Sequence, residues 1–172
     1  EYASATPKHQ ANLKAKDKIA IIYAEGDIVS GNDEYGVIDD GRYVKLLKDI
    51  RKQEEIKAVV LRINSPGGSI LSAENIYRQL VGLQADGKKL VISMGDLAAS
   101  GGYYLSAMAD SIFAQPNTLT GSIGVFSLIP NPSRALDEKL GVRFDTVRTG
   151  PYSADFTVMF PWQEREHTYM QQ

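Results

Sequence analysis

The stretch KAVVLRINSPGGSILSAENIYRQLVGLQADGKKLVIS, residues 57–93, contains one complete strand–helix–strand repeat. Residues 57–63 form an apolar, β-branched run typical of a buried strand, and the run ends at the turn-forming residues 64–68. Apolar side chains then recur at helical spacing in residues 72–84, and a second apolar run follows at 90–93. This order predicts a βαβ unit, in which the two strands are parallel.

Further elements of the same two kinds lie on both sides of this repeat. Residues 19–24 are strand-like, and residues 43–50 carry apolar side chains at helical spacing. Strands that alternate with helices predict an α/β fold with a mostly parallel sheet. The other expected elements are, in chain order, a loop at 30–41, a helix at 104–108, a strand at 111–114, a helix at 133–140, a strand at 142–148 and a helix at 162–172.

The expected domain organisation is simple. The length of 172 residues suits one domain with a sizeable core. Residues 1–17 are polar and rich in Lys and Ala, so we expect a linker or a loose N-terminal segment there. Residues 18–172 are expected to form the α/β domain. Because the last helical pattern stops partway, we expect this domain to be truncated at its C-terminus and the chain to be a fragment.

The composition excludes several classes of function. The formal net charge is −2 and no basic run is longer than the pair at 88–89, so nucleic acid is not an expected partner. No apolar run approaches the ~20 residues that span a bilayer. The chain has no cysteine, which excludes disulfides and a thiol nucleophile. No His, Asp or Glu cluster has metal-ligand spacing, and no cofactor motif is present, so neither a metal nor a cofactor is expected.

Ser100 is the candidate nucleophile. It lies in MGDLAASGGYYLSAMAD, residues 94–110, between an apolar strand-like run and a helical pattern. A serine at a strand-to-helix turn is held with its Oγ exposed, and the small neighbouring residues let a substrate backbone approach. The N-terminus of the following helix offers N–H groups to a developing oxyanion. Taken alone, a run of small residues is more often a sign of tight helix packing.

The turn NSPGGS, residues 64–69, is a second candidate part of the site. Two consecutive strand ends of a parallel sheet are expected to lie side by side. The N–H of Gly68 and an N–H near Ser100 and Gly101 would then form two donors around one carbonyl oxygen. This pairing favours acyl transfer, although an isolated SPGG is also an ordinary strand–turn–helix connection.

Three motifs, INSPGGSILSAENIYRQL, VISMGDLAASGGYYLSAMAD and PNTLTGSIGVF, together resemble the signal peptide peptidase A (protease IV) family over about residues 18–172. The resemblance implies a Clp protease/crotonase-like fold of spiralled βαβ units and a serine peptidase activity. It implies that Ser100 is the nucleophile and that the Gly68 N–H is an oxyanion donor. The N–H of Ser100 itself is the implied second donor, with Gly101 near the oxyanion hole. Ser122 matches a serine that orients the general-base lysine.

The general base is where the chain departs from the family pattern. Relatives carry the lysine in a segment that resembles R-x-G-x-Y-K, whereas residues 148–153 read RTGPYS and place Ser153 at the lysine position. The departure resembles the C-terminal half of the long two-domain form, in which the other half supplies the lysine of the Ser/Lys dyad. We therefore expect the isolated chain to be inactive. Neither His9 nor His167 is favoured as a base, because a lone histidine is more often a surface or packing residue.

The stretch LTGSIGVF, residues 119–126, is the candidate peptide-binding segment. An apolar edge strand beside the serine can receive an extended peptide, with glycines that leave room for apolar side chains; ordinary core is the alternative. The resemblance implies hydrophobic peptide substrates such as cleaved signal peptides. The candidate substrate-binding residues are Gly67, Leu119, Gly121, Ile123 and Gly124.

The resemblance also implies a cellular setting. The protein is expected at a bacterial inner membrane with this domain facing the periplasm. Expected partners are the N-terminal half, further copies in an oligomer, and the membrane through a part that precedes this chain. Two other functions stay open: a crotonase-type acyl-CoA enzyme, which shares the two-donor oxyanion hole, and a catalytically silent scaffold domain, which Ser153 in the lysine position would suit.

Overall fold

The computed structural model describes residues 15–31, 35–125, 128–150, 152–153 and 155–171. The chain divides into two units, Glu1–Gly124 and Val125–Gln172. Each unit is described by itself below. Within the described ranges, no helix is both long and apolar enough to cross a lipid bilayer.

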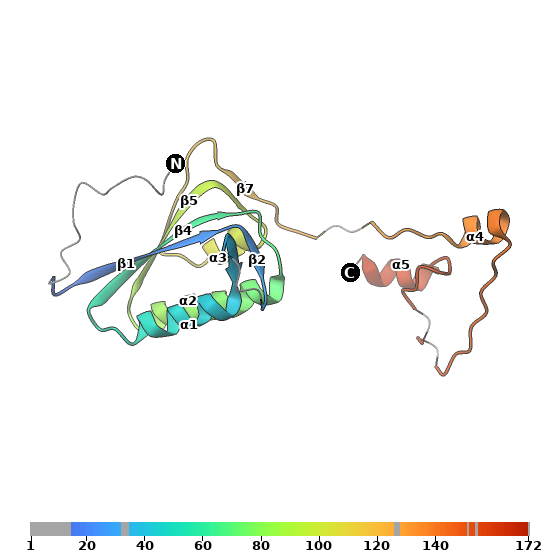
Figure 1. Cartoon of the computed structure of the whole chain (residues 1–172), viewed down its shortest axis with the longest axis horizontal. Helices are drawn as coiled ribbons and strands as arrows, with labels where there is room; N and C mark the ends of the chain where they lie inside the picture. Colours follow the sequence, from blue (N-terminus) through green and yellow to red (C-terminus); the bar gives the residue numbers. More distant parts are fainter. Residues whose placement is uncertain (1–14, 32–34, 126–127, 151, 154, 172) are drawn as a thin grey trace. The chain divides into compact units, whose positions relative to one another are not determined.

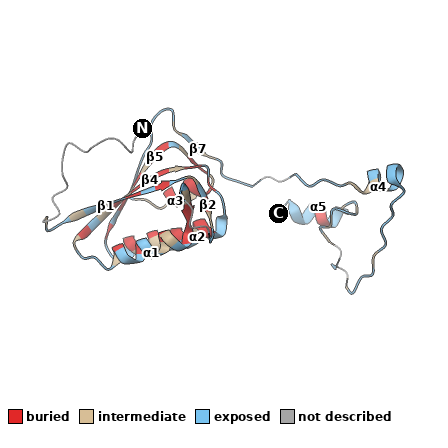
Figure 2. Cartoon of the chain, in the orientation of Figure 1, coloured by how far each residue is buried: buried red, intermediate tan, exposed pale blue. Residues whose placement is uncertain are grey.

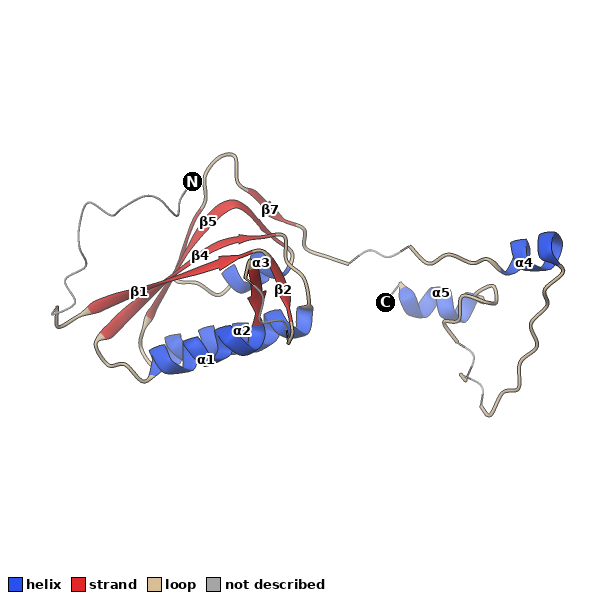
Figure 3. Cartoon of the chain, in the orientation of Figure 1, coloured by secondary structure: helices blue, strands red, loops and turns tan. Residues whose placement is uncertain are grey.

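The apolar run predicted at 57–63 is the central strand, β4, of a parallel sheet in the first unit. Strand β4 pairs with β1 on one side and with β5 on the other, and β5 also pairs with two short strands, β6 and β7. All of these pairs are parallel, as the βαβ pattern predicts (Figure 3). The strands are β1 Lys18–Glu25, β4 Ile56–Ser65, β5 Lys89–Ala99, β6 Ser111–Phe113 and β7 Leu119–Gly121.

Helices α1 and α2 lie along one face of this sheet (Figure 1). The strands alternate accordingly: Val59, Leu61 and Ile63 of β4 are buried, while the residues between them are partly exposed. Leu80 and Leu83 of α2 complete the core (Figure 2). The predicted α/β class is confirmed, and its core lies between the sheet and these helices. The helices of this unit are α1 Asp40–Arg51, α2 Ile70–Ala85 and α3 Gly101–Ser106.

Local sequence signals fix where these helices begin. Asp39 precedes α1, and its carboxylate accepts a hydrogen bond from the Arg42 N–H at 2.9 Å. Ser69 does the same for α2, because its hydroxyl accepts from the Ser72 N–H at 3.3 Å. Such N-caps satisfy N–H groups that have no partner within the helix. Ser69 therefore ends the NSPGGS turn and starts α2 in one step.

A small parallel sheet of two strands lies beside the turn. Strand β2 is Asp27–Val29 and strand β3 is Val37–Asp39. Ile28 of β2 forms an isolated parallel bridge with Gly68. The Ile28 N–H donates to the Gly67 carbonyl oxygen at 2.8 Å, and the Ser69 N–H donates to the Ile28 carbonyl oxygen at 2.8 Å. Strand β2 therefore holds the SPGG turn through backbone hydrogen bonds to both sides of Gly68.

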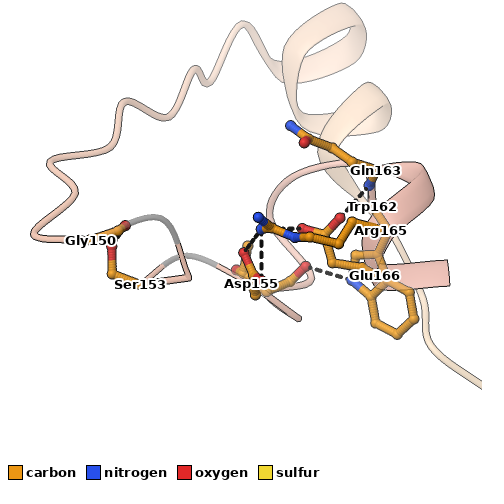
Figure 4. Close-up of polar contacts among 8 residues, drawn as sticks. Gly150, Ser153, Asp155, Trp162, Gln163, Arg165 and Glu166 are labelled. Carbon is orange, nitrogen blue, oxygen red and sulfur yellow. Dashed lines mark hydrogen bonds and ion pairs between the residues drawn. The ribbon is translucent and has the colours of Figure 1, made fainter. Parts of the chain in front are cut away.

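The second unit contains helices α4 Ser133–Leu140 and α5 Glu164–Met170. Helix α5 begins with a capping box, in which the Gln163 N–H donates to the Glu166 carboxylate at 2.9 Å. The Arg165 guanidinium donates to both carboxylate oxygens of Asp155, at 2.6 and 2.8 Å (Figure 4). No apolar side chain among the described residues of this unit is buried.

The observed elements correct several expectations. Strand β5 continues to Ala99, well beyond the expected 90–93, because neighbouring side chains bond its irregular end. The expected strand at 142–148 is wrong, since these described residues form no strand and no neighbouring strand pairs with them. The expected loop at 30–41 contains β3. Residues 1–14 of the expected N-terminal linker lie outside the described residues.

Candidate active site

Ser100 lies between the end of β5 and the start of α3, at a strand-to-helix turn. Its backbone has φ 50° and ψ −119°, a region that side-chain-bearing residues rarely adopt. A conformation of this kind costs on the order of 1–3 kcal/mol and persists only where the surroundings fix it. The Ser100 side chain makes no capping hydrogen bond to α3, so its Oγ is not committed to the helix. A strained turn that leaves an uncommitted hydroxyl suits a nucleophile.

The SPGG turn lies against Ser100. A Cβ placed on Gly67 would lie 2.6 Å from the Gly101 nitrogen and 2.8 Å from the Ser100 Cβ. Gly67 also has φ +105°, so both its space and its backbone require glycine. The side-by-side arrangement expected from parallel strands is therefore present. Gly67 is buried in this contact, and Gly68 beside it is exposed.

Two N–H groups of the turn form hydrogen bonds that hold the fold, and a third, that of Gly68, is available to the site. The Gly67 N–H donates to the buried Ser65 hydroxyl at 3.1 Å, and the Ser69 N–H is bonded to β2. In the described part of the chain, the Gly68 N–H has no acceptor. A Cβ placed on Gly101 would lie only 3.5 Å from the Gly68 nitrogen, so this N–H lies beside the first turn of α3.

The expectation that Ser100 supplies the second oxyanion donor is wrong. The Ser100 N–H donates to the Gly121 carbonyl oxygen of β7 at 2.9 Å, because β7 pairs with the end of β5. The neighbouring Gly101 N–H is the first of α3 and has no acceptor among the described residues, as is usual for the first turn of a helix. The two available donors beside Ser100 are therefore the N–H groups of Gly68 and Gly101.

Tyr104 attaches α3 to α2. Its hydroxyl donates to Glu74 Oε2 at 2.5 Å, and its ring stacks on that of Tyr77 with the centroids 4.8 Å apart. The hydrogen bond with the Glu74 carboxylate raises the pKa of the Tyr104 hydroxyl and lowers the pKa of Glu74. The Tyr104 N–H donates to the Ser100 carbonyl oxygen at 2.8 Å, so this attachment acts on the turn that carries Ser100.

The lysines nearest to Ser100 in the sequence are remote from it in the fold. Lys88 directly precedes β5 and Lys89 is its first residue, whereas Ser100 follows its end. A strand of this length separates them by about 30 Å. The Lys88 ammonium is buried and donates to the carbonyl oxygens of Gln53 at 2.7 Å and Ile56 at 2.8 Å. Neither lysine can reach the Ser100 hydroxyl, so β5 does not supply the base.

The residues linked to the general base lie apart in the sequence. Ser122 is exposed, has φ 55° and directly follows the Gly121 carbonyl that holds Ser100. Ser153 belongs to the second unit, where its hydroxyl donates to the Gly150 carbonyl oxygen at 2.9 Å (Figure 4). His167 lies in α5, and His9 lies outside the described residues.

The candidate peptide-binding segment begins with β7, which pairs with β5 at the Ser100 end. Leu119 is 68% exposed and Ile123 is 82% exposed. Gly121 is half-buried, and a Cβ on Gly121 or Gly124 would meet no atom within 4 Å. Exposed apolar side chains and open space therefore lie in and just after β7, the strand that bonds the Ser100 N–H.

Away from Ser100, the described residues contain no metal site, and an apolar pocket lies within the second unit. The side chains that the structure describes include no group of three or more His, Asp or Glu residues able to hold a metal ion. An apolar pocket lies within the second unit, with Ile129, Val158 and Trp162 among its lining residues, and it contains none of the predicted site residues.

Comparison with known proteins matches the chain to two family models. The model for peptidase family S49 matches residues 82–172, which include Ser100 and the whole second unit. The model for Clp protease matches residues 11–120, which include β1 to β5 and the SPGG turn. The Clp protease match agrees with the parallel sheet described above and supports the Clp/crotonase-like fold.

Curated relatives are proteases. Protease 4 of Haemophilus influenzae is 38% identical over 149 residues, which is 87% of this chain and 24% of that protein. Protease 4 of Salmonella typhi is 44% identical over 133 residues, which is 77% of this chain and 21% of that protein. The chloroplastic serine protease SPPA of Arabidopsis thaliana is 37% identical over 142 residues, or 80% of this chain and 21% of that protein. The chain thus spans less than a quarter of the length of these three relatives.

Proposed function

Because the chain belongs to peptidase family S49, we propose that its first unit carries the nucleophile and the oxyanion hole of a serine endopeptidase of the Ser/Lys type. The observation that carries the proposal is the pair of N–H groups, on Gly68 and Gly101, that have no acceptor among the described residues and lie close to a strained Ser100. The matched relatives are named as proteases, which favours a peptidase over the acyl-CoA alternative.

The proposed reaction is acyl transfer through Ser100. A base removes the Oγ proton while Oγ attacks the carbonyl carbon of the scissile peptide bond. The carbonyl oxygen becomes an oxyanion and accepts hydrogen bonds from the Gly68 and Gly101 N–H groups, each worth roughly 3 kcal/mol of barrier. The base then protonates the leaving amine as the carbon–nitrogen bond breaks. Water, deprotonated by the same base, hydrolyses the ester and restores the Ser100 hydroxyl.

The proposed base is a lysine from outside this chain. The resemblance to the family places Ser153 where the lysine is expected, and Lys88 and Lys89, just before and at the start of β5, are about 30 Å from Ser100. A lysine acts as a base when burial lowers its pKa and leaves the amine neutral. In this proposal the hydroxyl oxygen of Ser122, one residue after the carbonyl that holds Ser100, accepts a hydrogen bond from that amine and orients it, which leaves the amine lone pair for the Ser100 proton.

The proposed substrate is an extended hydrophobic peptide, such as a cleaved signal peptide, bound alongside β7. Backbone N–H and C=O groups of the peptide would form hydrogen bonds with the backbone of β7. Apolar side chains of the peptide would contact Leu119 and Ile123, which are largely exposed. The setting proposed with it is a bacterial inner membrane and the periplasmic side, with the lysine-bearing half and further copies of the protein as partners.

Hydrolysis of a hydrophobic fluorogenic peptide tests this proposal. Three proteins are compared: the full-length protein, its Ser100→Ala variant, and the 172-residue chain alone. We expect activity in the first, a loss of at least about 1,000-fold in the second, and no turnover in the third. Full activity of the isolated chain would contradict the external base. Activity that survives in Ser100→Ala would contradict the assignment of the nucleophile.

A further inference from the structure

Strand β5 is irregular just before Ser100. Ile63 of β4 pairs with Met94, and the next pair is Ser65 with Ala98, so two steps along β4 correspond to four along β5. The additional residues of β5 form a bulge at 95–97. Backbone groups in a bulge lose their partners in the neighbouring strand, and buried or half-buried ones need others.

Asn64 supplies one of these partners from the β4 side. Its side-chain Oδ1 accepts a hydrogen bond from the Leu97 N–H at 3.1 Å. A Cβ placed on Gly95 would lie 3.0 Å from the same Oδ1, so the bulge is closely packed on this amide. Asn64 is part of the NSPGGS turn motif. This motif therefore bonds β5, the strand that leads to Ser100, and also carries a proposed oxyanion donor, the Gly68 N–H.

Two threonines supply the other partners from the β7 side. The Thr118 hydroxyl donates to the Gly95 carbonyl oxygen at 2.8 Å, and the Thr120 hydroxyl donates to the Ala98 carbonyl oxygen at 2.7 Å. Thr120 also directly precedes Gly121, whose carbonyl accepts the Ser100 N–H. The bulge is therefore bonded by Asn64 of β4 and by Thr118 just before β7, and Thr120 of β7 bonds the residue that follows the bulge, all within five residues of Ser100.

We propose that Asn64, Thr118 and Thr120, here called the bulge clamp, are positioning residues that hold Ser100 in its reactive conformation. The proposal rests on the proposed function of Ser100. The positive φ of Ser100 persists only if the chain on both sides of it is fixed. The clamp fixes the strand that leads into Ser100, and Thr120 fixes the segment that accepts its N–H.

The three clamp residues lie outside the hydrophobic core. Their effect on the geometry of Ser100 can therefore be measured apart from their effect on the stability of the fold. Thr120 is exposed, and Thr118 and Asn64 are half-buried. Loss of the Thr120 hydroxyl or of the Asn64 amide oxygen removes one hydrogen bond each and leaves the core residues in place, whereas the Thr118 hydroxyl also accepts from the Gln115 N–H at 3.0 Å. Loss of either of the first two groups is therefore expected to change the geometry at Ser100 more than the stability of the fold.

Matched pairs of variants test the clamp in the full-length protein. Thr120→Val removes the hydroxyl at nearly constant shape, whereas Thr120→Ser keeps it. Asn64→Leu removes the acceptor, whereas Asn64→Asp keeps it. We expect Thr120→Val and Asn64→Leu to lower kcat about 10- to 100-fold with KM within threefold. Thr120→Ser and Asn64→Asp are expected to stay within threefold of the native kcat.

Two further readouts separate the possible failures. Affinity for a peptide boronate, which forms a tetrahedral adduct at the nucleophile, is expected to fall in parallel with kcat, while the melting temperature stays close to the native value. Native kcat in both Thr120→Val and Asn64→Leu would overturn the clamp, as would equal losses in Thr120→Val and Thr120→Ser. In either case an inactive Ser100→Ala leaves the proposed function standing, whereas an active Ser100→Ala overturns the function itself.

Discussion

The two units of the chain differ in what holds them together. In the first unit, a continuous core of buried apolar side chains lies between the sheet and its helices, and Leu80, Leu83 and Ile92 are fully buried (Figure 2). Among the described residues of the second unit, the one buried side chain is that of Glu166, which caps α5. The matches to peptidase family S49 and to Clp protease together cover residues 11–172, which include the whole second unit and all but the first ten residues of the first.

The difference shows where folding free energy arises. Burial of a Leu or Ile side chain stabilises a fold by about 1.5–3 kcal/mol, so the first unit has many such contributions. The second unit relies on local contacts: the Arg165–Asp155 ion pair, the capping box of α5, and the aromatic contact of Phe156 with Trp162. Contacts of this kind are individually worth about 1 kcal/mol or less. The candidate site belongs to the unit whose geometry is fixed by its core.

The largest expected difference is in core substitutions. Leu80 of α2 is 0% exposed, and Leu140 of α4 is 70% exposed. Leu80→Ala is expected to lower the free energy of unfolding by about 2–5 kcal/mol, because it removes buried contacts and leaves a cavity. Leu140→Ala is expected to change it by less than about 0.5 kcal/mol. Urea unfolding of both variants measures the contrast, and similar effects would contradict it.

Two glycines with positive φ provide the next comparison. A Cβ on Gly67 would lie 2.6 Å from the Gly101 nitrogen, whereas a Cβ on Gly141, at the end of α4, would meet no atom within 4 Å. Gly67→Ala must displace the first turn of α3, so kcat/KM of the full-length protein is expected to fall at least about 100-fold. Gly141→Ala carries only the backbone penalty of about 1 kcal/mol and is expected to leave kcat/KM within about threefold. A native rate in Gly67→Ala would show that the turn does not pack on Ser100.

Two aspartates give the smallest expected effects. Asp110 accepts hydrogen bonds from the Leu90 N–H and the Lys89 ammonium, each at 2.9 Å, whereas Asp137 accepts from the exposed Arg143 at 2.9 Å. The Leu90 N–H, together with the Lys89 ammonium, lowers the pKa of Asp110. Stability from a lowered carboxyl pKa is present above the ordinary value near 4 and is lost as the pH falls below it.

Asp110→Asn is therefore expected to reduce the free energy of unfolding at pH 7, and the deficit is expected to shrink as the pH falls below about 4. Asp137→Asn, which breaks an exposed pair, is expected to have no measurable effect at pH 7. Urea titrations at pH 7 and pH 3 measure both differences. A deficit for Asp110→Asn that is unchanged at pH 3 would contradict the role of its charge.

The contrast between the two units also explains which elements could be predicted from the sequence and which could not. Strand β4 and helix α2 were predictable because their buried faces impose a period on the apolar residues. Helix α4 matches the expected 133–140 because its C-terminal signal, Gly141, is local. The strand expected at 142–148 carries apolar residues but has no partner strand among the described residues, and an unpaired strand is not stable.

In the candidate site, the sequence predicted which residues lie close together, but not which hydrogen bond the Ser100 N–H forms. Parallel topology places the ends of β4 and β5 together, which brings Gly67 against Ser100. The sequence predicted an apolar edge strand beside the serine, which corresponds to β7, but the hydrogen bond of the Ser100 N–H to Gly121, 21 positions away, has no local signal in the sequence. The residues 94–99 were missed as part of β5 because Gly95 and Asp96 are typical of a turn. Side chains of other elements keep this segment in the sheet.

The central claim, that Ser100 is the nucleophile, is tested most directly by covalent labelling. The full-length protein is treated with a fluorophosphonate, which phosphonylates an activated serine, and the modified residue is located by mass spectrometry. We expect one adduct on Ser100 and none in the Ser100→Ala variant. An adduct on another serine, such as Ser122, or labelling that persists in Ser100→Ala, would contradict the account.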